Sequence, residues 1–284
     1  MRIRTILLQR SSVKSLTFLG DMFDGVQCPC ILLQLIATGK PLSTAGMMIE
    51  DRTRTYTIAM ERTVVPENFS FRMTDEEYRV LEKIKNSIPV CYLADHADFA
   101  LGIVTGNNKK FLSAEKTEHS EMVLKGTDIC KYHINPVKQY LRFEPEQFQQ
   151  VAPLEIYRAP EKLLYRFISN QLVVAYDDRQ MLSLNSCNIV IPKIDGMQIK
   201  YILAILNSSV SQFVYQKEFH SIKVLRAHME HIPIPRVGKA IQNEIIAMTE
   251  PLICGMGKEA AETCQKRLDC RIMDLFRLSA EEQW

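Results

Sequence analysis

The sequence has no run of eighteen or more uncharged apolar residues, which is the length that a membrane-spanning helix needs. Its first eight residues, 1–8, include two arginines and lack the longer apolar stretch of a signal peptide. We therefore expect a soluble, cytoplasmic protein. A composition of 46% hydrophobic and 24% charged residues over 284 positions allows a substantial core, in one large domain or two modest ones.

Clustered metal ligands are also missing from the sequence. The eight cysteines are scattered, and the one close pair, Cys28 and Cys30, has no second pair at the spacing of a tetrahedral zinc site. His228 and His231 lie three residues apart, but only Glu230 stands beside them as a further ligand. We therefore predict reduced cysteines, no metal site and no catalytic role for the histidines.

A strong excess of one charge is absent as well, because the formal net charge is only +2. Residues 101–142 contain seven Lys or Arg against four acids, residues 157–235 contain nine against six, and residues 237–284 contain six against eight. A mildly basic middle and an acidic tail are compatible with nucleic-acid binding. They are equally compatible with an ordinary solvated surface, so charge alone does not decide the function.

Periodicity and turn residues indicate an order of elements along the chain. Residues 1–60 predict strands of a sheet, with a β-hairpin in which 31–36 and 47–50 flank the turn 38–41. Thr74, followed by three acidic residues, predicts the start of a short connector helix. From about residue 90 to 195, short apolar runs broken by Gly, Asn and Asp predict a β-rich region with irregular loops.

The C-terminal third has the pattern of helices. Apolar residues mark one face of a helix over 199–215, and the two prolines in 232–235 exclude a helix there. Two further helices, about 238–254 and 258–276, are separated by a turn with two glycines and have the spacing of an antiparallel pair. The predicted fold class is α+β.

The stretch from Gly102 to Lys110 is the most distinctive local motif. Its two glycines, two amide side chains and two lysines follow an apolar run. Such a turn can present backbone N–H groups, the Thr105 hydroxyl and lysine ammonium groups to a phosphate. The alternative is an asparagine-rich turn that only caps a strand.

Four further segments follow this motif in a fixed order. They are 125–132, 158–169, 183–191 and 201–208, the last of which leads to Leu225–Arg226 and then to 232–235. In this order the segments resemble the TaqI-like target-recognition domain at the C-terminus of Type IIG restriction-modification enzymes and adenine-N6 DNA methyltransferases. That domain is itself similar to the recognition domains of Type I specificity subunits. The resemblance covers about residues 90–276.

The resemblance implies a particular domain organisation. A β-rich DNA-recognition domain over 91–235 is followed by a helical tail over 236–284 and preceded by a connector helix within 61–90. Residues 1–60 resemble the last strands of the α/β methyltransferase domain that precedes the recognition domain in this family.

The implied function is sequence-specific recognition of double-stranded DNA within a restriction-modification system. The family's glycine motif for the methyl donor and its Asn-Pro-Pro-Tyr motif are not in this sequence, since Asn135–Pro136 is followed by Val137. We expect no catalytic residue, no cofactor and no activity from this chain alone. S-adenosylmethionine is implied for the parent enzyme, an adenine-N6 methyltransferase that can also carry endonuclease activity. The alternative is a stand-alone specificity-like subunit whose helical tail docks a separate methyltransferase or nuclease chain.

The resemblance also implies which kinds of side chain contact DNA. Arg, Asn and Gln side chains read base edges in the major groove, whereas Lys and Arg neutralise phosphates. The candidate base readers are Asn107, Asn108, Arg158, Arg166, Arg179, Asn185 and Arg226. The candidate phosphate contacts are Lys109, Lys125, Lys131 and Lys217, and Thr105 and Lys110 complete the proposed phosphate turn.

Overall fold

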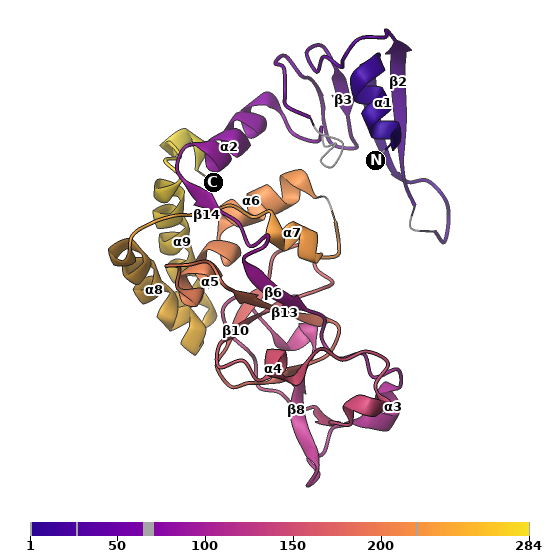
Figure 1. The fold of residues 1–284 in the computed structure, drawn as a ribbon. Helices are drawn as coiled ribbons and strands as arrows, with labels where there is room; N and C mark the ends of the chain where they lie inside the picture. The colour runs from indigo at the N-terminus through magenta and orange to yellow at the C-terminus, as the bar shows by residue number, and fades with distance from the viewer. Residues whose placement is uncertain (1, 27, 65–70, 220, 284) are drawn as a thin grey trace. The chain divides into compact units, whose positions relative to one another are not determined.

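The computed structural model of the chain describes residues 2–26, 28–64, 71–219 and 221–283. The chain forms two compact units, Met1–Glu82 and Lys83–Trp284 (Figure 1). Helices and sheets occur in both units, which confirms the predicted α+β class. Among the described residues, none of the helices is both long enough and apolar enough to cross a membrane.

The first unit is built around a four-stranded sheet. Its elements are helix α1 (Arg2–Arg10) and strands β1 (Ser11–Asp21), β2 (Pro29–Ala37), β3 (Met48–Glu50) and β4 (Thr55–Thr57). The strand order is β2-β1-β3-β4, with β1 antiparallel to β2 and parallel to β3. The core of the unit includes the buried side chains of Val13, Leu16, Ile49 and Phe71.

The predicted hairpin between residues 31–36 and 47–50 is wrong. These two segments, β2 and β3, lie on opposite edges of β1 and do not pair with each other. Strand β1 pairs with both because its buried Val13 and Leu16 form the middle of the sheet. Strand β1 contains three serines, so its sequence does not have the apolar pattern expected of a central strand. The chain also begins with a helix, α1, where we expected strands.

The predicted connector helix is confirmed as α2 (Asp75–Asn86). Its start is a capping box, in which the Thr74 hydroxyl accepts a hydrogen bond from the Glu77 N–H at 3.2 Å. The Glu77 carboxylate in turn accepts one from the Thr74 N–H at 2.7 Å. Acids in the first turn and lysines in the last turn complement the helix dipole.

The second unit contains two four-stranded sheets that share one core. The first sheet, in the order β11-β10-β13-β6, is antiparallel throughout. Its strands are β6 (Ala97–Ala100), β10 (Lys162–Arg166), β11 (Val174–Asp177) and β13 (Cys187–Pro192). The second sheet, in the order β12-β8-β9-β7, comprises β7 (Leu112–Ser113), β8 (Ser120–Leu124), β9 (Tyr140–Arg142) and β12 (Leu182–Ser183). A further pair joins β5 (Val90–Cys91) to β14 (Ile234–Pro235).

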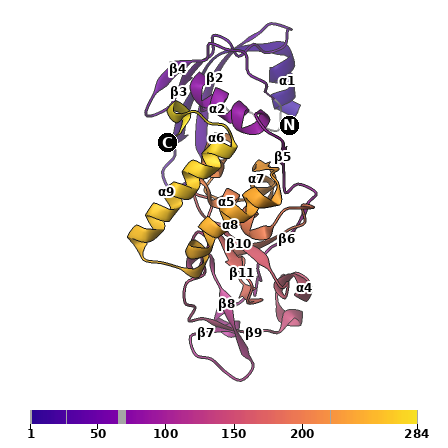
Figure 2. The ribbon, with the colours of Figure 1, turned by 90° about the vertical axis from the view of Figure 1, so that its left-hand side faces the viewer.

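The helices of the second unit are α3 (Asn108–Phe111), α4 (Leu154–Tyr157), α5 (Ile199–Asn207), α6 (Ser209–Glu218), α7 (Arg226–Glu230), α8 (Lys239–Cys254) and α9 (Lys258–Leu275), with short 3-10 turns at 126–128, 145–147 and 280–282. Of these, α5 with α6, α8 and α9 lie where the sequence predicts helices, whereas the short helices α3, α4 and α7 were not predicted. Helices α8 and α9 pack together as the predicted antiparallel pair (Figure 2). The helix expected over 199–215 is divided at Ser208, whose hydroxyl accepts a hydrogen bond from the Ser211 N–H and caps α6.

Candidate nucleic-acid interface

Two cations lie over aromatic rings on the surface of the second unit. The guanidinium carbon of Arg226 is 5.2 Å from the ring centroid of Phe99, and the Lys223 ammonium is 6.0 Å from that of Phe167. The Arg226 side chain is 61% exposed and donates a hydrogen bond from Nε to Glu230 at 2.7 Å, and this contact raises the pKa of Arg226. We call Phe99, Phe167, Lys223 and Arg226 the basic–aromatic patch.

Backbone hydrogen bonds fix the two loop segments of this patch against each other. The Val224 N–H donates to the Phe167 carbonyl at 2.8 Å, and the Ser169 N–H donates to the Ile222 carbonyl at 2.9 Å. The neighbouring side chains of Ile168 and Ile222 are 62% and 57% exposed. The patch therefore combines held cations with apolar side chains that face solvent.

His228 supports the helix that carries Arg226. The His228 Nδ1 atom accepts a hydrogen bond from the Leu225 N–H at 3.2 Å, at the start of α7. Its ring stacks on Phe219 with 4.4 Å between centroids. Burial lowers the pKa of His228, which favours the uncharged form that this acceptor role requires.

The turn 184–187 lies beside the patch and presents Asn185 to solvent. A Cβ on Gly102 would lie 2.1 Å from the Leu184 carbonyl oxygen, and one on Gly126 would lie 2.5 Å from the Ser186 carbonyl oxygen. Only glycine permits this close approach on both sides. The Ser186 carbonyl also accepts a hydrogen bond from the Phe167 N–H at 3.0 Å, which connects the turn to the patch.

Arg166 holds the backbone of a neighbouring turn. Its Nε donates to the Gly126 carbonyl at 2.8 Å and its Nη2 donates to the Ile129 carbonyl at 2.6 Å. We therefore assign this predicted base reader a structural role. The adjacent Lys125 side chain is exposed, while its backbone N–H donates to the Asp128 carboxylate at 2.8 Å.

The turn before α3 has the hydrogen bonds of a helix cap. Thr105 is buried and donates its hydroxyl hydrogen to the Asn108 Oδ1 at 2.6 Å. The Asn107 side chain accepts from the Lys110 N–H at 3.2 Å, as an N-cap residue does. Thr105 and Asn107 thus serve the turn itself. The Lys109 and Lys110 side chains are exposed, and the Lys110 ammonium donates to Gln147 at 2.7 Å.

Arg158 and Arg179 lie close to the loop 177–181, whose backbone is held by hydrogen bonds to the Asp177 carboxylate. The Arg158 guanidinium bonds the Gln180 carbonyl at 2.9 Å and the Glu121 carboxylate at 2.6 Å. The Arg179 side chain is exposed and has no ion pair or side-chain hydrogen bond among the described residues. Below it, the buried Asp177 carboxylate accepts the Arg179 N–H at 2.9 Å and pairs with buried Lys162 at 2.6 Å.

The side chains of Lys131 and Lys217 contact other groups of the protein. The Lys131 ammonium donates to the Asn207 carbonyl at 2.9 Å, and burial lowers the pKa of this lysine, an effect that Asp269 opposes. Lys217 is half-buried, with its ammonium 5.6 Å from the ring centroid of Phe213. Of the predicted residues, Arg226 belongs to the patch, and Asn185, Lys125 and Arg166 lie on segments that adjoin it or hydrogen-bond to its backbone.

Sequence reasoning missed most of the basic–aromatic patch. Phe99, Phe167 and Lys223 come from three separated segments, and only the spacing of Lys223 and Arg226 before a short helix could have indicated a basic surface. Across the described residues, His, Cys, Asp and Glu side chains form no group of three or more that could hold a metal ion.

Comparison with known families supports the resemblance found in the sequence. Residues 121–234 match the model of the TaqI-like C-terminal specificity domain. This segment contains three of the four patch residues as well as Lys125 and Asn185, and the match confirms the predicted family likeness for this part of the chain. No curated protein sequence matches the chain significantly.

The solved structures that resemble this chain include the following three. The Type IIL restriction-modification enzyme MmeI, solved in complex with DNA, is 8% identical and has a TM-score of 0.59 over 98% of this chain and 46% of that chain. The Type IIG endonuclease BpuSI is 10% identical, with a TM-score of 0.40 over 96% and 44%. The HsdS subunit of Thermoanaerobacter tengcongensis is 13% identical, with a TM-score of 0.38 over 72% and 51%. The chain thus spans about half the length of these proteins.

Proposed function

We propose that this chain recognises a DNA target sequence within a restriction-modification system. The observation that carries the proposal is the basic–aromatic patch, most of which lies inside the segment that matches a specificity domain. The similar enzyme MmeI was solved bound to DNA, which is consistent with this role.

The patch offers both kinds of contact that a DNA reader needs. Lys223 and Arg226 supply positive charge for phosphates or for guanine edges. Because their side chains already contact aromatic rings, less side-chain conformational entropy is lost when DNA binds. Asn185 stands exposed on a turn that two glycines hold in place, and we propose it as a base reader. Ile168 and Ile222 suit the only apolar group in the major groove, the thymine methyl group.

Other exposed cations complete the proposed interface. Lys109 and Lys125 are exposed, Lys110 is exposed and would exchange its bond to Gln147 for a phosphate, and Arg179 is exposed on a loop held by Asp177. We leave out Thr105, Arg166 and Lys131, since their polar groups already bond the protein.

The first test is selection from a randomised duplex DNA pool at low and moderate salt, followed by sequencing of the retained fraction. An enriched asymmetric motif is the expected result. Retention that depends on salt without enrichment would leave only an electrostatic DNA binder, and no retention at low salt would refute DNA recognition.

A pair of variants connects this selection to the patch. Lys223→Ala with Arg226→Ala should weaken binding to the selected site and reduce the salt slope by about 0.9 for each phosphate that is no longer neutralised. Lys239→Ala with Lys258→Ala removes the same charge from exposed positions on α8 and α9. If both double variants lose affinity equally, net charge and not the patch is responsible.

We also propose that a methyltransferase or nuclease domain or subunit covers strand β2 in the working enzyme. Strand β2 is at the edge of its sheet, and Ile31, Leu32, Leu35 and Ile36 on it are 41–61% exposed. Apolar side chains on both faces are typical of a strand buried inside a larger sheet. In this proposal residues 1–60 belong to the end of a methyltransferase domain, and S-adenosylmethionine binds the other part of that domain.

This surface differs from the helical tail considered in the sequence. Within the described part of 236–284, Met256, at 37%, is the large apolar residue that is exposed. Co-expression with the methyltransferase polypeptide of the same restriction-modification locus should give a complex that Leu32→Lys with Ile36→Lys abolishes. A complex that survives these changes but is lost after Met256→Lys would place the partner on the tail instead. The purified chain should retain no labelled S-adenosylmethionine by itself.

A further inference from the structure

The guanidinium group of Arg226 is held from two sides. Its Nε atom donates a hydrogen bond to the Glu230 carboxylate at 2.7 Å, one turn further along α7. Its carbon atom lies 5.2 Å from the ring centroid of Phe99 on strand β6. A planar guanidinium that is bonded at one edge and covers an aromatic ring keeps few orientations. The direction of its remaining donors is therefore largely set before any ligand arrives.

Both supports of this guanidinium are themselves anchored. Phe99 pairs with Val190 in the antiparallel sheet, and its ring contacts the buried ring of Tyr165 edge-on, with 6.5 Å between centroids. The Glu230 side chain is only 17% exposed, so neighbouring groups hold it in place. Recognition side chains are most precise when packed residues on helices and strands fix their orientation. Arg226 meets this requirement.

The terminal nitrogen atoms of Arg226 remain available to a ligand. Among the described residues, its Nε is the one guanidinium nitrogen with a hydrogen-bond partner, and the side chain is 61% exposed. The Nη1 and Nη2 atoms thus form a fork of two parallel N–H donors. Guanine presents O6 and N7 as a pair of acceptors in the major groove, and an arginine fork bonds both.

The neighbouring charges favour a base over a phosphate at Arg226. The carboxylates of Glu230 and Asp95 both raise the pKa of this arginine, so they also oppose the approach of an anion. Lys223 forms no ion pair in the described part of the chain, and its charge is not offset in this way. A phosphate is therefore attracted more to Lys223, whereas an uncharged guanine requires only aligned donors.

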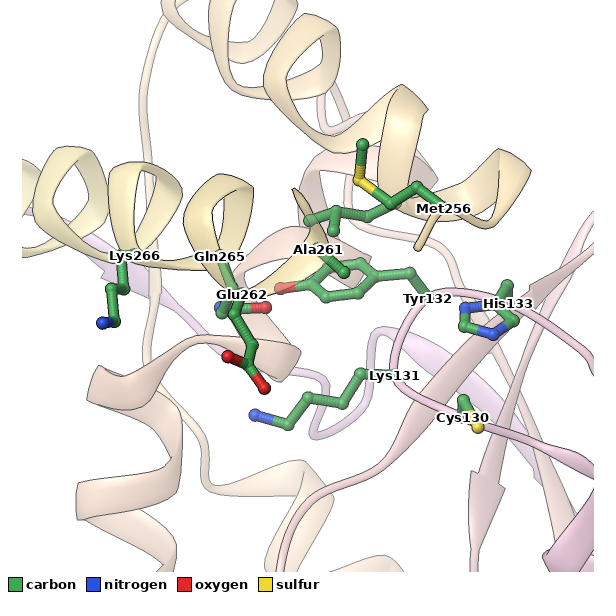
Figure 3. Close-up of a pocket in the computed structure, with 10 residues that line it drawn as sticks. Cys130, Lys131, Tyr132, His133, Met256, Ala261, Glu262, Gln265 and Lys266 are labelled. Carbon is green, nitrogen blue, oxygen red and sulfur yellow. The ribbon is translucent and has the colours of Figure 1, made fainter. Parts of the chain in front are cut away.

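The other predicted cations lack this combination of orientation and availability. The guanidinium groups of Arg158 and Arg166 each donate two hydrogen bonds to protein oxygens. Lys131 lines a pocket beside α8 and α9 (Figure 3) and bonds a backbone carbonyl. Arg179 is exposed, but no side-chain contact among the described residues orients it. Of these residues and Arg226, only Arg226 is both oriented and available.

We propose that Arg226 reads one guanine base of the DNA target, and that Glu230 and Phe99 are its positioning residues. Nη1 and Nη2 of Arg226 donate to O6 and N7 of this guanine, while Lys223 contacts a phosphate. This inference rests on the proposed function, and it specifies one base that the target sequence contains.

The test uses the duplex that is selected from the randomised pool, with each guanine replaced in turn by 7-deazaguanine. This base keeps O6 but has a carbon atom in place of N7. For the wild-type chain we expect one guanine at which the replacement weakens binding at least about fivefold, the lower limit for a good bidentate contact. Arg226→Ala should bind the two duplexes equally at this position while keeping its response at every other guanine.

Removal of Glu230 separates positioning from charge. Glu230→Ala takes away an acid, so it should bind a duplex without the target site at least as tightly as the wild type does. It should nevertheless discriminate guanine from 7-deazaguanine at least about twofold less, which a merely destabilised protein would not combine with undiminished affinity. Glu244→Ala is the matched control, because it removes an acid from a similar pair with Arg271 on α8 and α9 and should leave the discrimination unchanged.

Circular dichroism checks that each variant is folded, and Arg226→Met and Glu230→Gln replace the alanine variants if they are not. Equal discrimination by the wild type and folded Arg226→Ala would overturn the proposal and leave DNA recognition by the chain intact. A selected site in which no guanine responds to 7-deazaguanine would do the same. Failure of the wild-type chain to bind any duplex at low salt would instead refute the proposed function, and this inference with it.

Discussion

Replacing Lys162 with methionine should destabilise the second unit by about 3 to 5 kcal/mol, because it removes one partner of a fully buried ion pair. The Lys162 and Asp177 side chains are both 0% exposed, and their charged atoms are 2.6 Å apart on adjacent strands β10 and β11. Lys162 also donates to the Tyr157 carbonyl at 2.6 Å. Methionine fills similar space but leaves the Asp177 charge buried without its partner.

The magnitude follows from the size of the opposing terms. At 2.6 Å and an effective dielectric constant of about 20, the attraction between the two charges is about 6 kcal/mol, most of which offsets the cost of desolvating them. Loss of the lysine removes the attraction and keeps the desolvation cost of the carboxylate. The backbone N–H groups of Arg179 and Met181 still donate to Asp177, which limits the damage.

Urea denaturation followed by circular dichroism measures this change directly. The double variant Lys162→Met with Asp177→Asn should recover part of the lost stability, since no buried charge then remains unpaired. A loss below about 1 kcal/mol for Lys162→Met, with an unchanged urea dependence, would show that water or another group neutralises Asp177 and would refute the reasoning.

Three further expectations concern the interface and its support. Lys109→Ala with Lys110→Ala should weaken binding to all DNA sequences alike and flatten the salt slope, and an unchanged slope at low salt would remove this turn from the interface. Gly102→Ala should cost about 1 to 3 kcal/mol in a urea titration, because its Cβ would lie 2.1 Å from a carbonyl oxygen, whereas Gly238→Ala, with open space around its Cβ, should cost far less. Burial lowers the pKa of His228 from its ordinary value of 6.5. As the pH falls below 6.5, the unfolded chain therefore binds a proton at this histidine before the folded chain does. Stability should therefore fall as the pH drops below about 6.5, and His228→Asn, which keeps an acceptor for the Leu225 N–H, should flatten that dependence in thermal melts.

The elements with strong local signals were predictable from the sequence. The capping residues of α2, the two glycines between α8 and α9, and the prolines before α8 each act through neighbouring backbone, so the sequence predicts them without knowledge of the fold. The break at Ser208 is local too, but a continuous apolar face over 199–215 masked it.

The candidate site was predictable only in part. Arg226, Asn185 and Lys125 were identified by residue type and by their position in ordered segments. Arg166 has the same chemistry in sequence, yet its guanidinium bonds two protein carbonyls, which no local pattern reveals. Hydrogen-bond partners tens of residues away decide whether the charged group of a cation remains available to a ligand.

The sequence by itself determined the α+β class, the positions of α2, α8 and α9 and the likeness to a specificity domain, because these depend on periodicity, capping and the order of short segments. Only the tertiary structure decided that β1 lies between β2 and β3, and that Phe99, Phe167, Lys223 and Arg226 form one surface. The physical reason is that strand pairing and side-chain contacts join residues far apart in the chain. The free energy of these contacts depends on tertiary packing, which the local sequence does not specify.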